Sequence, residues 1–252
     1  MVNDMTSPTL RAAASSVLRD VRREPTRLCL LLVILPFVWD MIPAALPGIL
    51  LFEPEKALRP ESLISIPSVV SLVWATLIRS GMVQVAIVTA FGHKASVRDF
   101  VHGLRKAPAL FVSIGIPVTL LGVVLLKLQE LQVRYGAWVG LLLMAVTVFF
   151  AVRFILFPPA LLDGRCSFVE ALRLSWRLGK GHGKLLVGLA MVFAAEGLVF
   201  GLLMVVGLRS PIVGRFVVTL LDWFLVMLQS HAYVLCVAAN EETAQRRDVP
   251  KA

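Results

Sequence analysis

Six apolar runs, each long enough to form a membrane-crossing helix, make up most of this 252-residue chain. The hydrocarbon core of a bilayer is about 30 Å thick, and a helix needs about 20 apolar residues to cross it. Hydrophobic residues make up 58% of the chain, charged residues make up 16%, and the mean hydropathy is +0.84, a composition that excludes an ordinary soluble domain. The sequence therefore predicts an all-α fold, a polytopic membrane bundle of six transmembrane helices over Leu28–Phe52, Ile64–Phe91, Ala107–Leu126, Ala137–Pro158, Leu185–Leu208 and Phe216–Asn240.

The distribution of basic residues predicts which ends of these helices face the cytoplasm, because short cytoplasmic loops carry an excess of Lys and Arg. One set of loops holds 17 such residues and the opposite set holds 6. No removable signal peptide is expected, since the first 27 residues are mostly polar and no small-residue cleavage site follows the first apolar run. The prediction is a multi-pass protein of the inner (cytoplasmic) membrane with both termini cytoplasmic: an amphipathic segment over 1–27, a transmembrane domain over 28–240 and a tail over 241–252.

Short amphipathic helices at the cytoplasmic surface are predicted before the first, third and fifth spans. Ser96 precedes Asp99 by three positions, and Ser167 precedes Glu170 by three, which is the spacing of a capping box at a helix start. Basic and apolar residues alternate after each box, as is typical of a helix in the headgroup layer. The N-terminal stretch repeats this design, with one apolar face formed by Leu10, Ala14, Val17, Leu18 and Val21. The expected partners of these helices are the bilayer and its anionic headgroups.

Five charged residues interrupt the apolar runs, and they are the predicted binding site: Asp40, Arg79, Arg153, Glu196 and Asp222. A charged side chain at the bilayer midplane costs at least about 2.5 to 3.5 kcal/mol, so it normally faces a partner or a wet cavity. Arg79 is therefore expected to pair with at least one of the acids. Because three acids face two bases, either one carboxyl group is protonated or the site admits a cation or a proton.

Polar residues on the last predicted span share one side of its helix. The later four lie 7, 11, 14 and 18 positions after the first, and at 3.6 residues per turn these offsets keep all five on one face. This stripe is expected to face the interior of the bundle. Its members are Asp222, Gln229, Tyr233, Cys236 and Asn240.

Several functional classes lack support in the sequence. No catalytic motif is visible, so the chain is not expected to be an enzyme, and no cofactor is expected. Isolated cysteines such as Cys29, Cys166 and Cys236 are typical of small buried residues, so no metal site is predicted. The net charge of +9 lies mostly in loops on one side of the membrane, so it is interpreted as the orientation signal and predicts no nucleic-acid partner.

One segment carries a resemblance to a known family. It consists of the run from Arg153 through Pro158, Pro159 and Asp163 to Gly164, followed by Ser175-Trp-Arg-Leu178. This pattern resembles that of a broad group of six-span bacterial and archaeal membrane proteins, which includes the membrane domain fused to some glycerophosphoryl diester phosphodiesterases. The resemblance implies the fold more than a function. The soluble catalytic domain of those enzymes is absent from this sequence, so their activity is not carried over.

Two functional hypotheses remain open. In the first, the charged residues bind or move a small or amphiphilic, lipid-like solute through the membrane. In the second, they form a dry ion-pair network in a structural or accessory scaffold protein that has no transport activity. Protein partners are not indicated by any motif.

Overall fold

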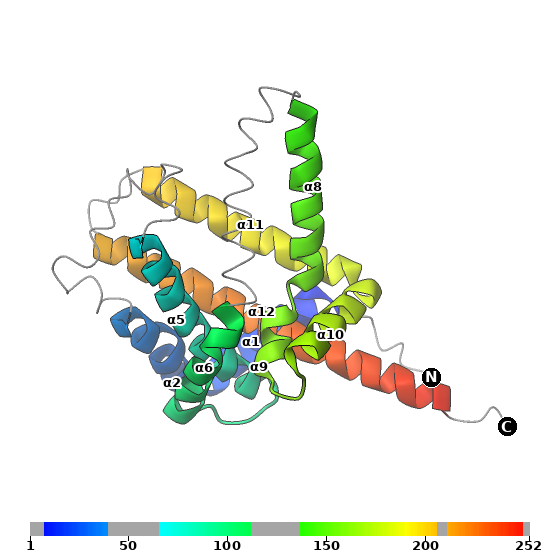
Figure 1. The fold of residues 1–252 in the computed structure, drawn as a ribbon. Coiled ribbons are helices and arrows are strands. Elements are labelled where there is room, and N and C mark those ends of the chain that lie inside the picture. The colour runs from blue at the N-terminus through cyan, green and yellow to red at the C-terminus, as the bar shows by residue number, and fades with distance from the viewer. Residues whose placement is uncertain (1–7, 40–65, 112–136, 206–210, 249–252) are drawn as a thin grey trace.

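The computed structural model describes residues 8–39, 66–111, 137–205 and 211–248 (Figure 1). Within these ranges every regular element is a helix, which confirms the predicted all-α class for this part of the chain. The elements are α1 (Leu10–Arg23), α2 (Pro25–Cys29), the π-helix η1 (Leu30–Ile34), α5 (Ile66–Ala90), α6 (Val97–Leu110), α8 (Ala137–Phe154), α9 (Phe157–Leu162), α10 (Phe168–Gly181), α11 (Gly183–Val205) and α12 (Pro211–Asp248).

Two helical segments are long and apolar enough to cross a membrane, Val73–Ala90 within α5 and Phe216–Glu242 within α12. The same length and composition occur in core helices of soluble proteins, so the two segments are a weak indication of a membrane location. The predicted number of six spans is not established by the described helices. Helix α12 also passes without a break through position 240, where the transmembrane domain was predicted to end.

The fourth predicted span, Ala137–Pro158, is not one continuous helix. Helix α8 ends at Phe154, Ile155 and Leu156 form a turn, and α9 begins at Phe157. Pro158 and Pro159 occupy the start of α9, where proline is favoured because its missing N–H would have no helical partner. The prediction of an uninterrupted helix was therefore wrong at this point.

The remaining predicted spans are described to different extents. Helix α5 agrees with the second span and α11 with the part of the fifth that is described. The helix of the first span begins earlier than predicted, at Pro25, and is described as far as Trp39. Most of the third span lies outside the described residues.

The N-terminal helix α1 packs against α12, with Ala13 and Val17 as its buried residues. Thr9 caps its start, because the Oγ1 atom of Thr9 accepts a hydrogen bond from the N–H of Ala12. Leu18, which was assigned to the apolar face, is 54% exposed. The other four predicted residues of this face, Leu10, Ala14, Val17 and Val21, are buried or pack against the core, so the predicted face is confirmed except at Leu18.

Helices α5 and α6 form a close hairpin. Gly92 has a φ of +80°, which allows the chain to turn directly after α5. At Gly81 an added Cβ would lie 2.8 Å from the Phe100 ring, and at Gly103 it would overlap the backbone carbonyl of Ser80. The absence of side chains at these glycines therefore permits the two backbones to approach each other.

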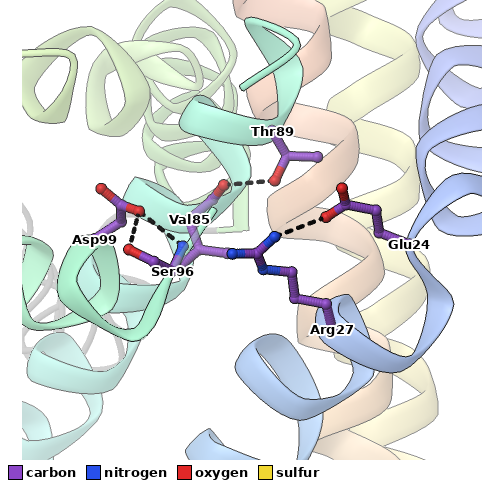
Figure 2. A network of polar contacts seen from close by, with 6 residues as sticks. All are labelled: Glu24, Arg27, Val85, Thr89, Ser96 and Asp99. Carbon is purple, nitrogen blue, oxygen red and sulfur yellow. Dashed lines mark hydrogen bonds and ion pairs between the residues drawn. The ribbon is translucent and has the colours of Figure 1, made fainter. Parts of the chain in front are cut away.

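Both predicted capping boxes are present. The carboxylate of Asp99 accepts from the backbone N–H of Ser96 at 2.8 Å and from its hydroxyl at 2.6 Å (Figure 2). Glu170 accepts from the backbone N–H of Ser167 at 2.8 Å, and this bond lowers the pKa of the Glu170 carboxyl. Figure 2 also shows the ion pair between Arg27 and Glu24 at the junction of α1 and α2. The capping-box pattern thus predicted both helix starts correctly.

Candidate functional site

Arg79 lies near the middle of α5 and forms an ion pair with Asp222 of α12. The Nη1 atom of Arg79 is 3.2 Å from the Oδ1 atom of Asp222, and the two side chains are 33% and 23% exposed. Oδ1 is buried, and its contact lacks the angular geometry of a hydrogen bond. The structure thus supplies the expected acidic partner of Arg79, and Asp222 is that partner.

Helix α11 contributes two groups to the same place. The guanidinium carbon of Arg79 lies 5.7 Å from the centre of the Phe193 ring, within the range of a cation–π contact. Glu196, three residues further along α11, interacts electrostatically with both Arg79 and Asp222. Three of the five predicted site residues therefore come together where α5, α11 and α12 meet. We call Arg79, Glu196 and Asp222 the interior triad.

The other two predicted site residues are not part of this group. Asp40 lies outside the described residues. Arg153, near the end of α8, is held between the rings of Phe149 and Trp176, at 5.4 Å and 5.3 Å from their centres. Its backbone carbonyl accepts a hydrogen bond from the Ser175 hydroxyl at 3.1 Å. These contacts place Arg153 against α10 rather than in the interior triad.

Buried polar side chains continue along both α5 and α12, which pack against each other. Gln229 donates a hydrogen bond to the backbone carbonyl of Ile155, which is free because the chain leaves the helix of α8 there. The buried atoms of these two helices that have no hydrogen-bond partner within the described residues include Oε1 of Gln84, Oε1 of Gln229 and Oγ of Ser230. Such atoms are costly in a dry interior unless water or a ligand satisfies them. The stripe predicted on α12 is thus buried at its middle positions.

A second charged group, which sequence reasoning missed, lies at the carboxyl end of α9. The side chain of Asp163 is only 7% exposed, and its Oδ2 atom lies 3.4 Å from Nε of Arg165. The hydroxyl of Tyr233 on α12 donates to the same oxygen at 3.0 Å. In the sequence, Asp163 belongs only to the pattern that resembles the six-span family, and Tyr233 belongs only to the polar stripe of the last span. No sequence signal predicts a contact between these two residues, which are 70 positions apart.

Lys106 of α6 joins this second group. Its Nζ atom donates to the carbonyl of Leu162 at 2.6 Å. Burial lowers the pKa of Lys106, and the charge of Asp163 opposes that shift in part. Gly164 has a φ of +78°, and an added Cβ would lie 2.9 Å from the Lys106 Nζ. The positive φ is what favours glycine at this turn, because the end of the flexible lysine side chain could move away from an added Cβ.

A pocket of about 210 Å³ opens beside this group. Its polar lining combines two acids, a base, a phenol and an amide, a set that could contact a small polar solute through either sign of charge. These residues are Asp163, Arg165, Tyr233, Asn240 and Glu241. On α12, Asn240 lies seven residues beyond Tyr233, which places the pocket at the end of the buried stripe.

The N-terminal helix is tied to α12 by a polar contact inside the fold. His231 is 4% exposed, and its Nε2 atom lies 2.8 Å from Oδ2 of Asp20 on α1. Its Nδ1 atom lies 2.9 Å from the carbonyl of Met227. This contact, together with the packing of Ala13 and Val17, fixes α1 against α12.

Replacing Tyr233 with phenylalanine should destabilise the protein by about 1 to 3 kcal/mol, because the buried carboxylate of Asp163 loses a hydrogen bond. The measurement is thermal unfolding of the purified protein in detergent. Ser230→Ala is the matched control, since it removes a buried hydroxyl whose oxygen has no partner among the described residues. Equal losses in the two variants would contradict a specific role for the Tyr233 contact.

Comparison with known proteins gave no relatives: no family model, no curated protein and no solved structure matches this chain.

Proposed function

We propose that this chain is a non-enzymatic, multi-pass inner-membrane protein of six spans that binds or moves a small or amphiphilic solute through the interior triad. The observation that carries the proposal is the ion pair of Arg79 and Asp222, with Glu196 beside it, where three apolar helices meet. A membrane helix retains charge at such depth at a considerable energetic cost, which is why such residues commonly mark solute pathways. The two acids exceed the single base within the triad, which suits a solute that carries a positive charge or a proton.

The polar residues between the triad and the pocket beside Asp163 support a route rather than an isolated pair. Oε1 of Gln229 and Oγ of Ser230, which have no hydrogen-bond partner in the described part of the chain, lie on α12 between Asp222 and Tyr233. The hydroxyl of Tyr233 then reaches Asp163. A solute or a chain of water molecules along this side of α12 would satisfy the unpaired atoms and connect the triad to the cytoplasmic side.

A structural scaffold is the second candidate function. It is favoured by one observation: Arg79 contacts α11 through Phe193 and α12 through Asp222, so a single side chain joins three helices. In a scaffold the triad would be a dry network whose only effect is on helix packing.

The resemblance to the six-span membrane domain remains part of the proposal. The residues of its pattern lie close together in the fold: Ser175 binds the Arg153 carbonyl, Trp176 stacks on the Arg153 guanidinium, and Asp163 is buried. This clustering supports the idea that the pattern specifies the junction of α8, α9 and α10.

Reporter fusions should place both termini in the cytoplasm, because the set of loops that includes the termini holds 17 Lys and Arg residues and the opposite set holds 6. Fusions after Arg59 and Arg209 should show periplasmic activity, and fusions after Arg105 and Arg177 should not. Strong periplasmic activity after Arg105 would overturn the proposed orientation.

Access of water to α12 separates the two candidate functions. A single cysteine is introduced at Gln229 or at Ser230 in a chain whose three native cysteines are replaced by serine. If a solute route follows the stripe, a small charged methanethiosulfonate reagent added from the cytoplasmic side should modify both. Met227→Cys is the control for the Gln229 position, because Met227 is equally buried but lies two residues away, nearly on the opposite side of α12.

The outcome distinguishes the candidates directly. Modification at Gln229 and Ser230 without modification at Met227 supports a solute route. If all three cysteines stay unmodified in a folded protein, the interior is dry and the scaffold is the better description.

A further inference from the structure

A groove of about 350 Å³ lies where α10 crosses the end of α8. It is lined by three apolar side chains, Phe154, Leu172 and Trp176, and by two arginines, Arg173 and Arg177. The rings of Phe154 and Trp176 lie 5.8 Å apart, which joins the two helices at this point. The groove therefore presents a hydrocarbon-like surface bordered by two cations.

A third arginine lies directly behind the groove. The guanidinium of Arg153 stacks on Trp176 at 5.3 Å, and its buried Nη1 atom has no hydrogen-bond partner among the described residues. Glu170 interacts with Arg173, but its carboxylate is hydrogen-bonded to the start of α10. Within the described chain, neither Arg177 nor Arg153 forms an ion pair, so the positive charge is largely uncompensated.

Helix α8 extends the apolar surface away from the groove. Phe149 and Phe150 are each 48% exposed, and the Phe150 ring stacks parallel to that of Phe154. An apolar chain lying on Phe154 could continue along Phe150. A molecule that matches the whole surface has a negative group at one end and a long apolar tail at the other.

We propose that the groove between α8 and α10 binds one anionic phospholipid of the cytoplasmic leaflet. The phosphate is recognised by Arg173 and Arg177, whose planar guanidinium groups bind phosphate oxygens in pairs. The acyl chain lies on Leu172, Trp176 and Phe154 and follows α8 toward the membrane interior. Arg153 adds positive potential from behind the indole ring without contacting the lipid. The site is separate from the interior triad and shares with the proposed function only the placement of α8 in a bilayer.

The test measures binding of phosphatidylglycerol to the full-length protein in detergent. Native mass spectrometry and the increase in melting temperature report the binding. Replacing Arg173 and Arg177 together with glutamine should weaken binding by about tenfold or more, since each basic contact at a membrane surface contributes substantially. The double variant Lys180→Gln/Lys184→Gln is the matched control. It removes the same charge from the same region, from exposed residues that do not line the groove.

Phosphatidylcholine and inorganic phosphate identify the ligand chemistry. Phosphatidylcholine should bind at least tenfold more weakly than phosphatidylglycerol, and millimolar phosphate should displace little of the lipid. Equal losses in the two double variants would show a non-specific attraction to basic loops and overturn the proposal. Complete displacement by phosphate would also overturn it, in favour of a site for a free anion.

A second measurement keeps both arginines in place. Phosphatidylglycerol with brominated acyl chains should quench part of the tryptophan fluorescence of the unmodified protein, and Trp176→Phe should remove most of that quenching. Quenching that is unchanged in Trp176→Phe would place the lipid elsewhere. Asp222→Asn should leave lipid binding intact, and the Arg173/Arg177 variant should leave the reactivity of Gln229→Cys intact, so failure of one proposal is distinguishable from failure of the other.

Discussion

Arg79→Leu is expected to destabilise the protein by about 3 kcal/mol, because removing one partner of a largely buried ion pair leaves the other charge without compensation. For a chain of this size that loss corresponds to a melting temperature lower by about 6 to 12 °C. The stranded group is Asp222, which lies 3.2 Å from Arg79, with Glu196 as a second acid beside it. The measurement is thermal unfolding in detergent.

The double variant Arg79→Leu/Asp222→Asn should recover much of the lost stability, since it removes the stranded carboxylate. Arg79→Leu/Glu196→Gln should recover less, because Glu196 interacts with the pair without a direct contact to Arg79. Arg105→Leu serves as the control at an exposed position of α6 and should change little. A single Arg79→Leu variant as stable as the parent would show that the arginine does not depend on the triad.

Gly103→Ala is expected to cost about 3 kcal/mol, at the upper end of the penalty for overpacking a core. The added Cβ would overlap the Ser80 carbonyl oxygen and lie 2.8 Å from the Gly81 Cα, and backbone atoms cannot move aside as a flexible side chain can. The expected consequence is a wider α5–α6 hairpin, a lower melting temperature and less folded protein in the membrane.

Gly181→Ala is the matched control for this substitution. Gly181 also lies in a helix, but a Cβ there would meet nothing within 4 Å. Alanine should therefore be neutral or slightly stabilising, because it restricts the unfolded chain more than glycine does. Equal destabilisation by the two substitutions would contradict the close approach of α5 and α6.

Local sequence signals were sufficient for the features that depend on neighbouring residues. The Ser96–Asp99 and Ser167–Glu170 boxes marked two helix starts, since a capping box involves residues only three positions apart. Apolar periodicity placed α5 and α11 closely. The interrupted fourth span was missed because an apolar run reads as continuous, although Pro158 and Pro159 can start a new helix within it.

The candidate site depended more strongly on the tertiary structure. The sequence by itself determined that Arg79 needs an acidic partner, because an unpaired guanidinium in an apolar helix is too costly. Only the packing of α5 against α12 decided that Asp222 is that partner, and only the packing of α8 against α10 placed Arg153 at Trp176 instead. The contact of Asp163 with Tyr233 and that of Asp20 with His231 join residues far apart in the chain, and such pairs are set by how helices pack rather than by any local pattern.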